Sequence, residues 1–161
     1  IRARIGVVIA VAATVALAVG GGTAIAQDDS GSSQGHGTFA LASFDWHFQR
    51  DSDGHVSGYF KGTATQPGGV LVAPEGRVTC ADFEGNKVGF LYPLEDDTRP
   101  SLAKGTYIMI TAEDNGGGGR DKIGFVGPAP KEAFPGCHPG VTPFSVTSGH
   151  TRVDSESPDS D

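Results

Sequence analysis

Glycine and other turn residues interrupt residues 36–153 so often that no helix of three turns is expected there. The whole chain has 25 glycines and 10 prolines in 161 residues. No window of this stretch repeats apolar residues at the three- and four-residue spacing of an amphipathic helix. Short runs of alternating apolar and polar residues lie between the turns instead. The sequence therefore predicts one all-β domain over residues 36–153, which is the size of a single small domain.

The clearest alternating run is residues 44–49, in which Phe44, Trp46 and Phe48 share one face. Residues 51–54 (Asp-Ser-Asp-Gly) form a turn pattern and residues 56–63 a returning strand, so we expect a hairpin over residues 43–63. Residues 106–111 are the most hydrophobic run and are predicted to be a central strand. The other expected strands are residues 70–72, 77–83, 87–94, 123–126 and 144–153, which makes about seven to nine strands in all.

Strands joined by short turns favour a meandering antiparallel sheet, closed into a single β-barrel or folded into a β-sandwich. Gly58, Gly89 and Gly124 lie inside the strand patterns. Glycines at such positions often mark bulges or the tight bends of a barrel wall. On that ground the barrel is the preferred architecture, and the sandwich is the alternative.

The first 26 residues have the three parts of a secretory signal peptide. Arg2 and Arg4 provide a positive start, residues 5–19 are apolar apart from one threonine, and Ala24 and Ala26 suit cleavage after residue 26. An uncleaved membrane anchor is the alternative, but the apolar run is shorter than the roughly 20 residues that span a bilayer. We therefore expect a protein secreted to the extracellular space, without a stable membrane anchor after cleavage.

Two polar segments flank the predicted domain. Residues 27–35 lack apolar side chains and are expected to be a disordered leader, and residues 154–161 an acidic disordered tail. Cleavage after residue 26 removes two arginines and changes the formal charge from −7 to −9. Because nucleic acids and anionic lipids bind clustered Lys and Arg, an acidic chain with scattered basic residues is not expected to bind nucleic acid.

The two cysteines, Cys80 and Cys137, both lie in the predicted domain. An even pair in an oxidising compartment most simply forms one disulfide. The alternative is a pair of metal-binding thiolates, but the close C-x-x-C spacing of such sites is absent. The sequence predicts a Cys80–Cys137 disulfide.

Several short motifs occur in an order that resembles a group of small secreted proteins, frequent in actinobacteria and of uncharacterised function. They are G-H-G-T-F at 35–39, G-R-V-T-C at 76–80, E-G-N-K-V at 84–88, E-D-N-G at 113–116, D-K-I at 121–123 and V-T-S-G-H at 146–150. His150 stands where the group has Asn, and four glycines lengthen the loop after Asn115. The resemblance implies export and an all-β fold, and it implies no activity.

Histidines are the first residues to consider for catalysis. Only His47 and His150 lie on strand patterns, and His47 is on the polar face opposite Trp46. The sequence offers no strand–turn–helix context that could hold a serine nucleophile. The sequence thus assigns no catalytic residue and no cofactor, although a hydrolase or isomerase with a site near His47 stays open.

Two loops carry enough oxygen ligands to be considered for calcium. Residues 51–54 resemble the start of a calcium loop, but a later ligand position holds Gly62, and a hairpin turn explains them better. The better candidate is the loop of residues 113–122, where Glu113, Asp114, Asn115 and Asp121 flank four glycines. Hard cations prefer such oxygen ligands, so this set is a weak calcium candidate, with ordinary solvated turn residues as the alternative.

These features favour a secreted, non-enzymatic β-domain that acts as a binding or surface-associated module for an unidentified extracellular ligand or partner. The alternatives are a small β-barrel that binds an apolar small molecule and the enzyme with a site near His47. The interior should distinguish them. A core filled with aromatic side chains indicates the module, whereas a pocket indicates a ligand-binding protein, or the enzyme if His47 lies inside it.

Overall fold

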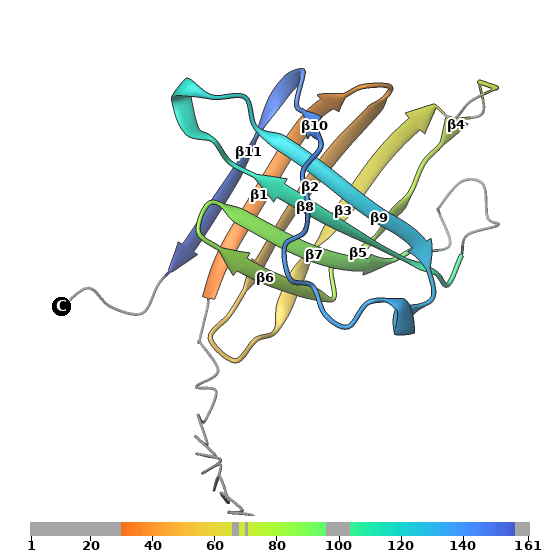
Figure 1. Ribbon diagram of the computed structural model, residues 1–161. Coiled ribbons are helices and arrows are strands. Elements are labelled where there is room, and N and C mark those ends of the chain that lie inside the picture. Colours follow the sequence, from red (N-terminus) through yellow and green to blue (C-terminus); the bar gives the residue numbers. More distant parts are fainter. Residues whose placement is uncertain (1–29, 66–67, 70, 96–103, 157–161) are drawn as a thin grey trace, which may run out of the picture.

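In the computed structural model the chain folds into two antiparallel β-sheets (Figure 1). The structure describes residues 30–65, 68–69, 71–95 and 104–156. The first sheet has strand order β11-β1-β2-β3-β4, with β5 paired to β3, and the second has order β10-β9-β8-β7-β6. The strands are β1 Ser30–Phe39, β2 Ala42–Arg50, β3 Val56–Thr65, β4 Leu71–Val72, β5 Glu75–Arg77, β6 Cys80–Glu84, β7 Lys87–Pro93, β8 Tyr107–Glu113, β9 Lys122–Ala129, β10 Phe144–Ser145 and β11 Ser148–Glu156.

The all-β prediction is confirmed, but the preferred barrel is wrong, because the two sheets do not close on each other. They pack face to face as in a sandwich, and their inner side chains form one core. Trp46 and Phe48 from β2 contact Phe90 from β7, with ring centroids 5.3 and 4.8 Å apart. The described residues contain two short 3-10 turns, Gly116–Gly118 and Lys131–Ala133, and no α-helix; no helix among them is long and apolar enough to cross a membrane.

The interior strand glycines have a different reason from the bends of a barrel wall. A side chain at Gly89 would collide with the carbonyl of Cys137, and one at Gly124 with the carbonyl of Val141. The segment between β9 and β10 thus lies directly against the outer face of the second sheet, where the Gly140 N–H donates to Thr111 Oγ1 at 2.9 Å. These glycines mark a close approach of two backbones, which is the other usual reason for glycine in a strand.

The predicted hairpin over residues 43–63 is confirmed as β2 and β3, with Phe44, Trp46 and Phe48 all buried. The run at 106–111 is confirmed as the centre of its sheet, because β8 lies between β7 and β9. Both of its faces are covered, one by the core and one by the segment between β9 and β10, which explains its hydrophobicity.

Two predicted strands are each broken in two. Residues 77–83 divide into β5 in the first sheet and β6 in the second, and residues 144–153 divide into β10 in the second sheet and β11 in the first. A buried valine lies in each break, Val78 and Val146. The chain crosses between the sheets at these points, and the two breaks together with β1, which was not expected, give eleven strands among the described residues.

Strands extend into both flanking segments, which corrects the expectation of disorder for residues 30–35 and 154–156. Residues 30–35 belong to β1, which pairs with β11 on one side and β2 on the other, and residues 154–156 belong to β11. Ser33 accepts a hydrogen bond from the Trp46 indole N–H at 3.0 Å and donates to the Arg152 carbonyl at 2.9 Å. The polar composition of residues 30–35 did not predict this strand. Its hydroxyls and glycines accommodate the indole of Trp46. The predicted signal peptide, residues 1–26, lies outside the described residues.

The Cys80–Cys137 disulfide is present, with Cα atoms 6.0 Å apart. It joins β6 to the segment that crosses the outer face of the second sheet. Because the two cysteines are 57 residues apart in the sequence, the disulfide restricts the conformations that are open to the unfolded chain.

Candidate ligand-binding pocket

The two sheets leave a cavity of about 670 Å³ between them at the end of the sandwich where the β1–β2 turn lies. Side-chain size explains it on the first sheet. On the inner face of β2, the large side chains of Phe44 and Trp46 are followed towards the pocket by the small Ala42. On β3, the large Phe60 is followed in the same direction by Gly62 and Ala64. Ala42 pairs with Ala64, so two small side chains lie together where the core has aromatic rings elsewhere.

The opposite wall belongs to the second sheet and is apolar. Ile110 and Ile123 form its inner part, buried to 4% and 0% exposure. Phe125 is on the same face as Ile123 but is 50% exposed, and Phe144, which pairs with Ile123 across the two strands, is 37% exposed. The two rings stack with centroids 5.9 Å apart. Phe39 of β1 packs against both rings, at centroid distances of 6.3 and 5.5 Å, and leaves part of each exposed.

The β1–β2 turn forms the rim of the pocket on the first sheet. Leu41 is 75% exposed there. Its neighbour Ala40 has a φ of +47°, a left-handed conformation that is uncommon for a residue with a side chain. Backbone strain of this kind is often found at binding sites.

Few polar side chains line the pocket, and none of the described residues that line it is charged. The hydroxyls of Ser43 and Thr63 pair with each other across β2 and β3. Tyr92 from β7 is fully buried, with its ring stacked on Phe60 at 4.6 Å. Its hydroxyl has no hydrogen-bond partner among the described residues. Burial raises the pKa of this hydroxyl well above its ordinary value of 10.0, so it remains a neutral donor.

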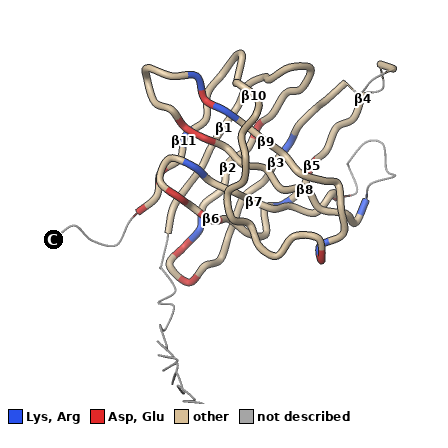
Figure 2. The backbone as a smooth tube through the Cα atoms, in the orientation of Figure 1, with Lys and Arg blue, Asp and Glu red and all other residues tan. Residues whose placement is uncertain are grey.

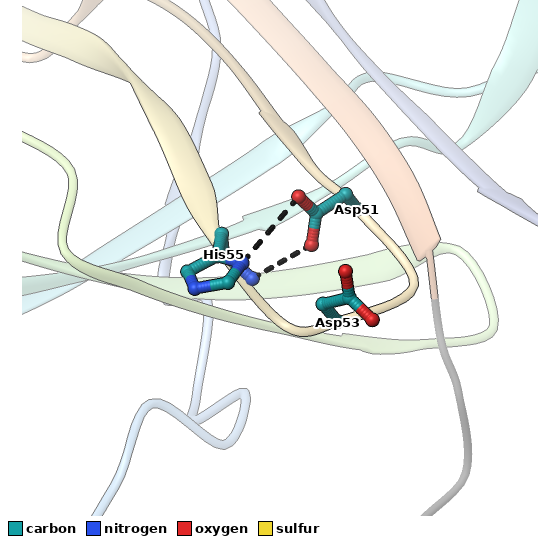
Figure 3. A group of neighbouring side chains, drawn as sticks. All are labelled: Asp51, Asp53 and His55. Atoms are coloured by element: carbon teal, nitrogen blue, oxygen red, sulfur yellow. Dashed lines mark hydrogen bonds and ion pairs between the residues drawn. The ribbon is translucent and has the colours of Figure 1, made fainter.

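A second, polar hollow of about 510 Å³ lies at the other end of the first sheet, beside the β2–β3 hairpin. There Asp51, Asp53 and His55 have ligand atoms within 4.8 Å of one another, and all three are exposed (Figure 3). Asp51 Oδ1 accepts the His55 N–H at 2.8 Å, and the Gly54 N–H donates to the Asp51 carbonyl at 3.0 Å. These bonds are those of a tight hairpin, so the predicted turn is confirmed and accounts for the cluster.

Two of the predicted calcium ligands, Asp121 and Asp114, accept hydrogen bonds from backbone N–H groups. Asp121 Oδ1 accepts the Asn115 N–H at 2.9 Å and Oδ2 accepts the Thr151 N–H at 2.6 Å. Asp114 accepts the Gly116 N–H at 2.9 Å. Among the described residues, the acids of this loop do not bring three ligand atoms within reach of one another. Their oxygens are satisfied by backbone donors, which explains acids beside a Gly-rich loop.

Glu113 begins the same loop and faces two side chains. Its carboxylate accepts the Thr142 hydroxyl at 2.7 Å and lies 3.5 Å from Lys87 Nζ. The Thr142 hydrogen bond lowers the pKa of Glu113 from its ordinary value of 4.5, with a smaller contribution from Lys87. Glu113 therefore also connects β8 to the segment between β9 and β10.

The histidines lie outside the apolar pocket. His47 is exposed on the outer face of β2, opposite the core face that carries Trp46. His36 is in β1 and packs edge-to-face against His150 of β11, with ring centroids 4.5 Å apart. His138 bridges Asp82 at 3.1 Å and Glu84 at 3.4 Å. Charged residues are scattered, with Lys and Arg interleaved among Asp and Glu over the described residues (Figure 2).

Comparison of the chain with protein-family models, curated proteins and solved structures found no match. Function must therefore be inferred from the chemistry of the site. The pocket was not predicted from the sequence, although one signal for it was present. The inward positions of the predicted hairpin change from aromatic to alanine and glycine at residues 42, 62 and 64.

Proposed function

We propose that this protein is a secreted, non-enzymatic binding protein that holds an apolar small molecule in the pocket between its two sheets. The observation that carries the proposal is the apolar pocket with its exposed aromatic rim. Its volume, about 670 Å³, lies within the usual range of ligand pockets. A large exposed apolar surface is unfavourable in water unless something covers it. The disulfide supports an oxidising compartment, in agreement with export.

The residues around the pocket support binding better than catalysis. Catalysis needs a nucleophile, acid or base within reach of the substrate. The lining residues that the structure describes provide hydroxyls and apolar groups, with no histidine, cysteine or carboxylate among them. His47, the residue considered for an enzyme, lies on the outer face of the first sheet.

The test is a titration of the folded protein with the uncharged fluorescent probe N-phenyl-1-naphthylamine. The wild type should bind it saturably with an emission increase. Ala64→Phe places a ring on the inner face at the pocket and should weaken binding about tenfold or more. Ala133→Phe, the same substitution at an exposed site outside the pocket, is the matched control and should bind as the wild type does. Absence of saturable binding, or equal binding by the two variants, would overturn the proposal.

A further inference from the structure

Two histidines lie side by side on the outer face of the first sheet. His36 in β1 and His150 in β11 are direct cross-strand partners, and both are exposed. The preceding residue, Gly35, faces the Trp46 ring in the core, so the alternation of the strand directs His36 outward. Directly opposite residues of an antiparallel pair project from the same face of the sheet. Both imidazoles are therefore accessible from the same side.

The spacing of the two rings suits two ligands of one metal ion. Their centroids are 4.5 Å apart, and the rings meet edge to face with an interplanar angle of 78°. Imidazole nitrogens bind Zn²⁺ at about 2.0–2.1 Å, which places the centroids of two neighbouring ligands about 4.5–5 Å apart. Because both side chains are exposed, each ring can rotate to direct one nitrogen to a shared ion.

The backbone beneath the pair fixes this spacing before any ligand binds. Gly149, with a φ of +88°, lies so close to β1 that a side chain there would collide with the His36 carbonyl. One residue beyond the strand, the Thr147 N–H donates to the Thr38 carbonyl at 2.8 Å. Ligands that the fold already holds together lose less conformational freedom on binding.

Asp45 places a carboxylate beside the pair. It is the direct cross-strand partner of His36 in β2 and is exposed on the same face. A metal-bound histidine commonly donates its second ring N–H to a carboxylate, a carbonyl or water. On the other side, the next outward residue of β11 is Arg152, whose charge is offset by Asp154 at 2.7 Å. The surroundings of the two imidazoles thus favour a cation.

We infer that His36 and His150 chelate one divalent transition-metal ion on the outer face of the first sheet, independently of the apolar pocket. Imidazole suits Cu²⁺, Ni²⁺ and Zn²⁺, and the affinity of a given site for first-row divalent ions is highest for Cu²⁺. Ca²⁺ prefers oxygen ligands. The expected order is therefore Cu²⁺ first, Ni²⁺ and Zn²⁺ weaker, and Ca²⁺ weakest, with water completing the coordination.

The test is calorimetric titration of the folded protein with each of these four metal chlorides, together with electron paramagnetic resonance of the bound Cu²⁺. The tightest Cu²⁺ should show coupling to two imidazole nitrogens. His36→Phe and His150→Phe each keep an aromatic ring in the pair but remove its ligand nitrogens. Each should raise the Kd of Cu²⁺ about tenfold or more, because the second ligand of a chelate binds intramolecularly, and should leave coupling to one nitrogen.

His47→Phe is the matched control, because His47 is exposed on the same face but has Gln34 and Tyr59 as its cross-strand partners. It should leave the Kd of Cu²⁺ unchanged within about twofold. All three variants are surface substitutions and should melt, without metal, within about 2 °C of the wild type. An unchanged Kd in His36→Phe or His150→Phe would overturn the inference. Loss of the tightest site in His55→Phe instead would place the metal at the β2–β3 hairpin and overturn it as well.

Discussion

Asp121 provides the sharpest test of how the loop after β8 is held. Its side chain is 9% exposed, and its two carboxylate oxygens accept the backbone N–H groups of Asn115 and Thr151 at 2.9 and 2.6 Å. Its own carbonyl accepts the Val146 N–H at 2.9 Å, a bond that substitution leaves intact. The carboxylate therefore connects the loop to β11 in the other sheet.

The effect of Asp121→Ala follows from these two bonds. A hydrogen bond to a charged group contributes about 1.5–3 kcal/mol, and the buried N–H of Thr151 would lose all of it. Asn115 is partly exposed, so its N–H regains water and loses only about 0.5–1.5 kcal/mol. The free energy of unfolding should fall by roughly 2–4 kcal/mol, and the melting temperature by on the order of 10 °C.

The measurement is urea unfolding followed by the fluorescence of Trp46, the single tryptophan, in the presence of a calcium chelator. Asp53→Ala replaces an exposed acid of another turn and should change stability by less than about 0.5 kcal/mol. An Asp121→Ala variant as stable as Asp53→Ala in chelator would refute the structural role. A loss of stability that appears only when calcium is present would make Asp121 a metal ligand instead.

Two further predictions concern the core and the pH dependence of stability. Gly35→Ala should destabilise the protein by about 1–3 kcal/mol and change the emission of Trp46, because the new methyl group collides with the indole ring. Gly117→Ala is the control and should do neither, because its methyl group meets nothing within 4 Å. Equal stability of the two variants would contradict the packing of Gly35 against Trp46. Glu113 has a lowered pKa because Thr142 donates to it, so this bond stabilises the fold above the ordinary pKa of 4.5 and the contribution is lost as pH falls through the folded-state value. The stability difference between wild type and Thr142→Val should therefore be largest near neutral pH and shrink below about pH 4 in urea unfolding, and a difference independent of pH would refute the link to Glu113.

The fold class and the main hairpin could be predicted from the sequence, because they depend on local patterns. Alternation in residues 44–49 places three aromatic rings on one face whatever the partner sheet is. The central position of β8 followed from its hydrophobicity, and the disulfide from there being two cysteines. The barrel was predicted wrongly because glycines at 89 and 124 were interpreted as bends. A glycine has the same sequence signature whether the chain bends there or another backbone lies against it.

The site depended on contacts between segments far apart in the chain. Acids at 113–121 are compatible with a metal or with backbone donors, and only the positions of Asn115 and Thr151 show that backbone N–H groups use the Asp121 oxygens. The sequence by itself determined which faces of the strands are apolar and that the chain would form sheets. Only the tertiary structure decided that small side chains of β2 and β3 face Ile110 and Phe125 across a gap, and that Tyr92 lies beside it. The physical reason is that local periodicity specifies the direction of each side chain, whereas a cavity depends on the summed volumes of side chains that meet from both sheets.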